Sequence, residues 1–134
     1  MKSVKSNVGR PLPIGARMEC CDNSGAKIVQ IISVSHFKAR TNKLGCGGVA
    51  DLITVAVKTG KPDMVHKVMP AVIVRQKKEF TRPDGTKVKF EDNAAVILKD
   101  IKLGTPKGTL IKGPIAKEVA IRWTAVAKLA TMIL

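Results

Sequence analysis

The chain has 134 residues, enough for one domain with a sizeable core, and 45% of them are hydrophobic, which excludes general disorder. Its 24 Lys and Arg against 10 Asp and Glu give a net charge of +14, an excess that repels itself in a compact protein unless a polyanion neutralises it. Nucleic acid is therefore the first candidate partner, and an anionic membrane surface the second.

The first third of the chain predicts two strands joined by a tight turn. Residues 1–16 hold two Gly and two Pro and are expected to form an extended N-terminal extension. Strands are predicted for Arg17–Asp22 and Ala26–Phe37, and Asn23-Ser24-Gly25 between them favours a turn, because Asn bonds its own backbone and Gly takes positive φ. Lys38–Gly48 follows as a basic, glycine-containing loop.

Three further apolar segments predict core strands. Leu52–Lys58 alternates between apolar and polar residues, and Val68–Val74 and Ala94–Leu98 are the other two. Lys99–Lys112 is a connection rich in Gly, Lys and Pro. Short turns between consecutive strands favour antiparallel pairing, and a small closed barrel would remove exposed strand edges. We therefore predict a mainly β fold with about five strands in an antiparallel barrel.

A basic hairpin is predicted between the last two of these strands. Asp84-Gly85 lies between two strand-like arms, Glu79–Phe80 and Val88–Phe90, which is a strong hairpin signal. From Arg75 to Lys89 there are six positive residues and two negative ones, a net charge of +4 within 15 residues. Pairing of the two arms would concentrate this charge at one end of the molecule.

The C-terminus, residues 113–134, is predicted to be helical. Gly113-Pro114 is typical of a helix start, because Pro suits the first helical position. Ile115, Val119 and Trp123 follow at helical spacing, as one helix or two short ones. This apolar stripe either docks on the barrel or contacts a protein partner, and the spacing does not decide between the two.

The chain is expected to be cytosolic. Its three Cys form no disulfide-rich pattern. No apolar segment follows the basic N-terminus as in a signal peptide, and no apolar run approaches the roughly 20 residues that a bilayer span needs. We expect no membrane partner.

Candidate catalytic and metal-binding groups are few. Cys20 and Cys21 are adjacent and cannot reproduce the spaced ligand pairs of zinc sites, and only Cys46, His36 and His66 remain to complete one. An enzyme would have to depend on these Cys and His residues. We expect no catalytic residue, metal or cofactor.

Three basic clusters are better candidates for a binding site. Each could be a solvated face on its own, but together, in a chain of net charge +14, they favour nucleic acid. Aromatic residues, at 3%, are too scarce for stacking on single-stranded bases, so contacts to phosphates and to RNA shape are expected. The candidate residues are Lys38, Arg40 and Lys43 in the loop, Arg75, Lys77, Lys78, Arg82, Lys87 and Lys89 in the hairpin, and Lys102, Lys107 and Lys112 in the connection.

Several motifs follow one another in a defined order over residues 17–122: Asp22–Lys27, Ala71–Val74, Asp84-Gly85, Phe90 with Asn93, Val96-Ile97, and Gly113-Pro114-Ile115 with Glu118. In this order they resemble a universal family of large-subunit ribosomal proteins, number fourteen in bacterial naming and twenty-three in older eukaryotic naming. Gly60-Lys61-Pro62 and Lys67–Pro70 resemble its eukaryotic and archaeal branch. Ala50-Asp51 stands where the family usually has Gly-Asp, so the start of the next strand is expected to differ slightly.

The resemblance implies a five-stranded β-barrel with a projecting hairpin and short C-terminal helices, in a non-catalytic structural protein of the large ribosomal subunit. It implies binding of the basic residues to large-subunit ribosomal RNA, and a position at the intersubunit face, opposite small-subunit rRNA. Neighbouring large-subunit proteins, notably number three, and a subunit anti-association factor are the implied protein partners, with Ile115, Val119 and Trp123 as candidate contacts. The alternative, from charge and strands alone, is a free-standing RNA-binding barrel protein.

Overall fold

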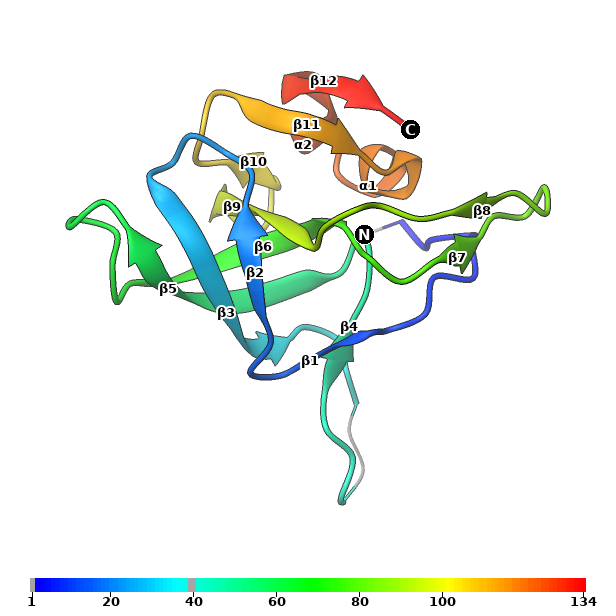
Figure 1. The fold of residues 1–134 in the computed structure, drawn as a ribbon, viewed down its shortest axis with the longest axis horizontal. Coiled ribbons are helices and arrows are strands. Elements are labelled where there is room, and N and C mark those ends of the chain that lie inside the picture. Colours follow the sequence, from blue (N-terminus) through cyan, green and yellow to red (C-terminus); the bar gives the residue numbers. More distant parts are fainter. Residues whose placement is uncertain (1, 39–40) are drawn as a thin grey trace.

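The computed structural model describes residues 2–38 and 41–134, and β-strands dominate it (Figure 1). Five strands close a barrel, since β9 pairs with both β6 and β2. This arrangement confirms the predicted five-stranded barrel. Its strands are β2 (Arg17–Cys20), β3 (Ala26–Val34), β5 (Leu52–Gly60), β6 (Val68–Arg75) and β9 (Ala94–Asp100).

One pairing in the barrel is not antiparallel. Neighbours β2–β3, β3–β5, β5–β6 and β6–β9 are antiparallel, whereas β2 and β9 run parallel, with Glu19 opposite Ala94. Strand directions cannot alternate all the way around a closed ring with an odd number of strands. A five-stranded barrel therefore needs one such parallel pair, and it falls between strands distant in sequence, which no tight turn joins.

The barrel wall separates two hydrophobic clusters. One includes Val29, Val55 and Ile73 from three barrel strands, and the other joins Val72 and Val96 to the C-terminal helices. Strands β6 and β9 are buried on both faces, because successive side chains point alternately to the two clusters. This explains why both strands are continuous apolar runs in the sequence rather than alternating ones.

Short strands also occur within the predicted N-terminal extension, the predicted loops and the hairpin. β1 pairs with β4, β7 with β8, and β10 with the barrel strand β9. The predicted extension, loop and connection thus each contain ordered β structure. These strands are β1 (Leu12–Pro13), β4 (Cys46–Gly47), β7 (Phe80–Thr81), β8 (Lys87–Val88) and β10 (Thr105–Pro106).

The C-terminal region departs most from the sequence prediction. The proposed helix start at Gly113-Pro114 is wrong, because both residues lie in strand β11 (Ile111–Ile115). This strand is fixed by partners distant in sequence: Lys112 N donates to Cys21 O (2.7 Å), and β11 pairs in parallel with a strand that was not predicted, β12 (Ala130–Ile133). Two short helices lie between them, α1 (Lys117–Arg122) and α2 (Thr124–Leu129).

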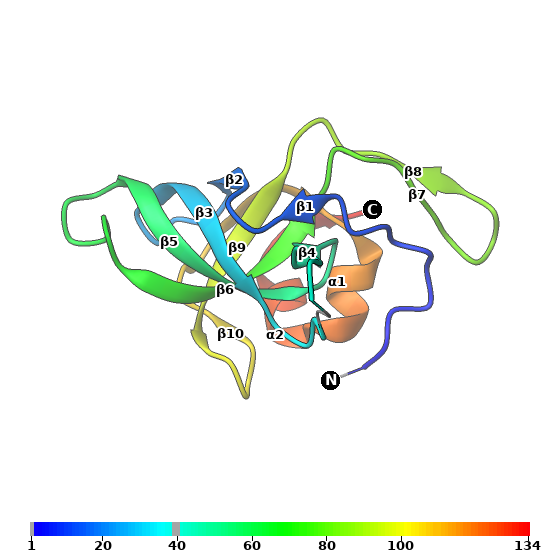
Figure 2. The same cartoon turned by 90° about the horizontal axis from the view of Figure 1, so that it is seen from below.

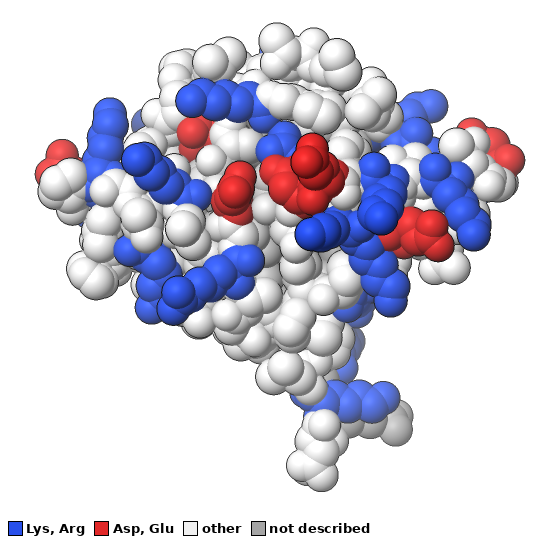
Figure 3. Space-filling view, in the orientation of Figure 1, with Lys and Arg blue, Asp and Glu red and all other residues white. Residues whose placement is uncertain are grey.

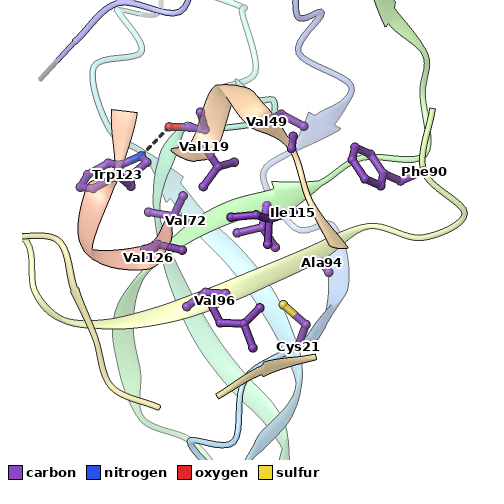
Figure 4. Close-up of a cluster of buried hydrophobic side chains, with 14 of the residues drawn as sticks. Cys21, Val49, Val72, Phe90, Ala94, Val96, Ile115, Val119, Trp123 and Val126 are labelled. Atoms are coloured by element: carbon purple, nitrogen blue, oxygen red, sulfur yellow. Dashed lines mark hydrogen bonds between the residues drawn. The ribbon is translucent and has the colours of Figure 1, made fainter. Parts of the chain in front are cut away.

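The break between the helices falls at Trp123, whose φ of −121° and ψ of 77° are not helical. Its indole Nε1 donates a hydrogen bond to Ala50 O (2.9 Å), and its ring packs with Val119 and Val126 against the barrel (Figure 4). Ala50 itself has a φ of 70°, a conformation that favours glycine. Within the described residues, no helix is long and apolar enough to cross a bilayer.

Candidate RNA-binding surface

The β7–β8 hairpin and the described part of the loop between β3 and β4 project from the barrel, and so does the connection between β5 and β6, which holds Lys61 and Lys67 (Figure 1). The hairpin pairs Phe80 with Val88 and closes through Gly85 N, which donates to Arg82 O (2.9 Å). Gly85 has a φ of 85°, as expected for the last residue of a three-residue hairpin loop. The structure therefore confirms the hairpin predicted from Asp84-Gly85.

The base of the hairpin is anchored in the protein. Phe80 and Phe90 are buried in the cluster beneath the C-terminal helices. The N-terminal segment runs beside the hairpin, where Asn7 N donates to Thr81 O (2.9 Å) (Figure 2). The hairpin direction is thus set by the core and by a neighbouring strand-like segment.

Four lysines of the hairpin region are exposed. Lys77, Lys78, Lys87 and Lys89 place their ammonium groups at the surface. Lys87 Nζ lies 3.9 Å from Glu79 Oε1, but both side chains are about two-thirds exposed (67% and 60%), so this pair contributes little. These four side chains keep the charge and freedom to bind phosphates.

Arg75 differs from these lysines because it is buried, with 8% of its surface exposed. Its Nε and Nη2 donate to the two carboxylate oxygens of Asp92 (2.8 and 2.9 Å), and Nη1 donates to Lys112 O and Pro114 O (both 3.0 Å). The guanidinium therefore joins the hairpin base to β11. We leave Arg75 out of the proposed RNA-binding surface.

Arg82 is also engaged inside the molecule. Its Nε donates to Glu118 Oε1 (2.9 Å) and its Nη2 to Leu134 O (2.5 Å). Ser6 Oγ donates to the same Glu118 oxygen (2.8 Å). Burial opposes ionisation of Glu118, yet the hydrogen bonds from Arg82 and Ser6 outweigh it and keep the pKa of this carboxyl below its usual value. Glu118 thus joins α1 to the N-terminal segment and the hairpin, and Arg82 joins the hairpin to the C-terminus.

The other two basic clusters are at the surface. Lys38 and Lys43 in the β3–β4 loop are exposed, whereas Arg40 lies outside the described residues. Lys102, Lys107 and Lys112 are exposed as well, although Lys107 Nζ lies only 3.2 Å from Met64 Sδ. On the face in Figure 3, Lys and Arg lie in several separate groups around a central acidic group, rather than in one patch.

The candidate partner residues of the C-terminal stripe are in the core. Ile115 and Val119 have no exposed surface, and Trp123 has 7%. All three pack against the barrel. The helical spacing had left open whether this stripe docks on the barrel or contacts a protein partner, and the structure shows that it docks on the barrel. The exposed apolar side chains of this region are instead Ile121 on α1 and Met132, Ile133 and Leu134 at the C-terminus.

The adjacent thiols Cys20 and Cys21 lie in environments that disfavour the thiolate form. Burial raises the pKa of the Cys21 thiol to about 11, and burial with the neighbouring Asp22 carboxylate raises that of Cys20. Both thiols are therefore poor nucleophiles at neutral pH. Across residues 2–38 and 41–134, no group of three or more His, Cys, Asp or Glu side chains is placed to hold a metal ion.

The internal role of Arg75 and Arg82 was not predicted from the sequence. A signal was available, because Arg is preferred for buried ion pairs with bidentate geometry, whereas Lys keeps its ammonium hydrated. Arg75 directly follows the apolar run Ala71–Val74 and is therefore close to the core in sequence. The partner carboxylates, Asp92 and Glu118, are 17 and 36 residues away from their arginines, so the pairs themselves could not be predicted.

Comparison with known proteins identifies the family of the chain. The profile of the family described as Ribosomal protein L14p/L23e matches residues 12–134. The chain is 53% identical over 133 residues to "Large ribosomal subunit protein uL14" of Nanoarchaeum equitans. It is 52% and 50% identical to the proteins of that name from Methanococcus maripaludis and Methanococcus vannielii. Each of the three matches covers 99% of both chains. These relatives are archaeal, in agreement with the predicted branch. The chain belongs to the Ribosomal protein L14p/L23e family.

Proposed function

We propose that this protein is a non-catalytic structural constituent of the large ribosomal subunit, where it binds ribosomal RNA at the intersubunit face. The observation that carries the proposal is the combination of a full-length family match with exposed lysines on two projections of a rigid barrel. The whole chain would act in the cytoplasm as one ribosomal-protein domain within the translating ribonucleoprotein.

The distribution of charge supports contacts to RNA phosphates rather than to bases. The exposed lysines come from the hairpin region, the β3–β4 loop, the β9–β11 connection and β11 itself, so they can reach separate RNA segments. Ammonium groups neutralise phosphates and release counterions, and binding should therefore weaken steeply with salt. The proposed contacts are Lys38, Lys43, Lys77, Lys78, Lys87, Lys89, Lys107 and Lys112.

Protein partners would meet a different surface. Because Ile115, Val119 and Trp123 are buried, we propose that neighbouring proteins contact the exposed apolar side chains Met132 and Ile133 of β12 instead. Large-subunit protein number three and a subunit anti-association factor remain the proposed partners, and small-subunit rRNA is the proposed contact across the intersubunit face. Exposed apolar side chains beside a strand edge suit a protein better than RNA.

Sucrose-gradient sedimentation of a cell extract tests the role directly. The protein should comigrate with the large subunit and with whole ribosomes in low salt, and should be released from the large subunit by high salt. Absence from the large-subunit fractions would overturn the proposal. Binding of the purified protein to arbitrary single-stranded RNA without ribosome association would instead identify a free-standing RNA-binding protein.

A further inference from the structure

Strand β12 is attached to the protein by few side chains. It lies on the outer side of β11, away from the barrel (Figure 1), and pairs with no other strand among the described residues. The side chains of Met132, Ile133 and the following Leu134 are about half exposed, at 56%, 47% and 51%. Burial of apolar surface therefore stabilises this strand little, and a two-stranded sheet has only marginal stability of its own.

Backbone hydrogen bonds are the main attachment of β12. Leu134 N donates to Ile115 O (2.9 Å), and Lys117 N donates to Leu134 O (2.7 Å), so Leu134 joins the end of the strand to the start of α1. The pairing with β11 is irregular, because the register shifts between Ile111 and Pro114, and Pro114 has no N–H to donate. The strand thus has few interactions that oppose its local opening.

Arg82 adds a contact from the hairpin. Its Nη2 donates to Leu134 O (2.5 Å), and among the described residues it is the one side chain of another element that hydrogen-bonds to β12 or Leu134. Its Nε and Nη2 also donate to the two carboxylate oxygens of Glu118 (2.9 and 3.3 Å), whose side chain is 5% exposed. The carboxylate therefore fixes the guanidinium in the position from which it bonds Leu134 O.

Strand β11 is anchored independently of β12. Arg75 Nη1 donates to Lys112 O and Pro114 O (both 3.0 Å), and Lys112 N donates to Cys21 O (2.7 Å). The first and last residues of β11 are at most 1% exposed. Because none of these contacts involves β12, the outer strand can leave while β11 stays in place.

We propose that Arg82 is a latch that keeps β12 docked on β11, and that β12 opens as a local unit, without unfolding of the barrel, when this contact breaks. The opening breaks the hydrogen bonds of Leu134 and leaves the anchors of β11 intact. Its consequence rests on the proposed function, because docking determines whether Met132 and Ile133 form an ordered surface for a protein partner. In the free protein, the latch restrains an apolar edge strand until a partner covers it.

Hydrogen exchange of individual backbone amides, followed by NMR on the purified full chain, measures this opening. The Leu134 amide reports on β12, and the amide of Ile31, which donates to Ala16 O (3.0 Å), reports on unfolding of the barrel. Leu134 should exchange much faster than Ile31, and its rate should not respond to low concentrations of urea, because the local opening exposes little surface. Equal exchange rates for the two amides would overturn the proposal.

Arg82→Lys tests the latch itself. Lys keeps a positive charge beside Glu118 but has a single nitrogen in place of the planar fork, so it cannot bond the carboxylate and Leu134 O together in the geometry that Arg adopts. Exchange of the Leu134 amide should become about tenfold faster, which corresponds to the loss of one charge-assisted hydrogen bond. An unchanged rate would contradict the role of Arg82.

Arg122→Lys is the matched control. The Arg122 side chain is as exposed as that of Arg82 (16%) and also pairs with a carboxylate, that of Asp51, but none of its hydrogen bonds among the described residues reaches β12 or Leu134. Its pair stays intact when β12 alone opens, so exchange of Leu134 should change less than about twofold. An acceleration equal to that in Arg82→Lys would show that Leu134 exchanges through global unfolding, and the latch would be rejected.

Glu118→Gln provides a second variant that acts through the same guanidinium. It removes the charge that fixes Arg82, so it should also accelerate exchange of the Leu134 amide. Combined with Arg82→Lys, the acceleration should be smaller than the product of the two single factors, because both changes weaken one contact; a full product would contradict the shared latch. These experiments use the isolated chain, so absence from the large-subunit fractions would leave the latch intact, and the two proposals fail separately.

Discussion

The arginines and the lysines of the β7–β8 hairpin region use positive charge in opposite ways. Arg75 at the base and Arg82 beside the turn are enclosed and donate to Asp92, to Glu118 and to backbone carbonyls. On the exposed part, four lysines extend from nearby positions of the same 15-residue stretch into solvent. Arginines and lysines that contribute equally to the net charge therefore have different roles.

The difference teaches how a basic projection can be both firmly held and available to RNA. A guanidinium can form several hydrogen bonds in one plane and is more weakly hydrated than an ammonium, which suits it to partly buried ion pairs. An ammonium on a flexible stem can adapt to the positions of phosphates. We expect the arginines to control stability and the lysines to control RNA affinity, and each prediction below tests this division.

Arg75→Met should have the largest effect on stability. It leaves the Asp92 carboxylate and two backbone carbonyls without their donor, at a cost of about 2–3 kcal/mol, less than for a fully buried pair because Asp92 is one-third exposed (34%). Urea denaturation measures the loss. Lys77→Met is the control, with an expected change within about 0.5 kcal/mol. Similar losses of stability in both variants would contradict the proposal that the arginines determine stability and the lysines do not.

Replacing Lys77, Lys78, Lys87 and Lys89 together by Gln should mainly affect RNA binding. If each lysine contacts one phosphate, affinity for archaeal large-subunit rRNA should fall about a hundredfold, and the slope of log affinity against log salt should decrease by about one per lost contact. Filter binding at several salt concentrations measures both quantities. Unfolding should be almost unchanged.

The control for this variant carries the same charge change elsewhere. Lys27, Lys58, Lys61 and Lys67 are exposed on and after β3 and β5. Their replacement by Gln should reduce affinity less than the hairpin variant does. Equal reduction would show that net charge, rather than the hairpin, determines RNA binding.

Glu118→Gln should destabilise the protein by about 1–2 kcal/mol at neutral pH, because Arg82 loses its charged partner. The pKa of Glu118 is lowered on folding from an ordinary value of 4.5, so the unfolded chain takes up this proton more readily than the folded one. The stabilisation is therefore complete above about pH 4.5 and is lost as pH falls through the lower folded pKa. Urea denaturation at neutral pH and at about pH 3 should show the two proteins converging; a constant difference would contradict the assigned role of the carboxylate.

Gly85→Ala should have the smallest effect, about 1 kcal/mol, and should affect the tip of the hairpin alone. Gly85 has a φ of 85°, and a Cβ there would meet nothing within 4 Å, so the cost is backbone strain without a clash. Gly9→Ala is a matched control, because its Cβ is equally free and its φ is not in the left-handed region. Thermal denaturation should separate the two variants, and a larger loss for Gly9→Ala would contradict this account.

Much of the barrel was predictable because its strands carry their own signals. Alternation in Leu52–Lys58 and apolar runs in Val68–Val74 and Ala94–Leu98 located three of its strands to within a few residues. Asp84-Gly85 located the hairpin because its turn depends on neighbouring residues alone. The family motifs added the closed barrel, which local patterns favoured but could not prove.

The C-terminal region shows where local signals fail. Gly113-Pro114 suits a helix start, yet pairing with β12 and the hydrogen bond from Lys112 N to Cys21 O hold this segment extended. The free energy gained from these long-range backbone contacts exceeds the local preference of Gly113-Pro114 for a helix start, because such preferences are weak for single residues. The helical spacing of Val119 and Trp123 was meaningful, but Trp123 interrupts the helix to reach Ala50 O.

The sequence by itself determined the class of fold and the family and predicted a polyanionic partner, because periodicity, motif order and net charge are properties of the chain alone. Only the tertiary structure decided which positive charges remain available. Arg75 and Arg82 are removed from the surface by carboxylates and carbonyls from distant segments, and Ile115, Val119 and Trp123 by the barrel wall. The physical reason is that burial and ion pairing depend on neighbours in space, which a linear pattern does not specify.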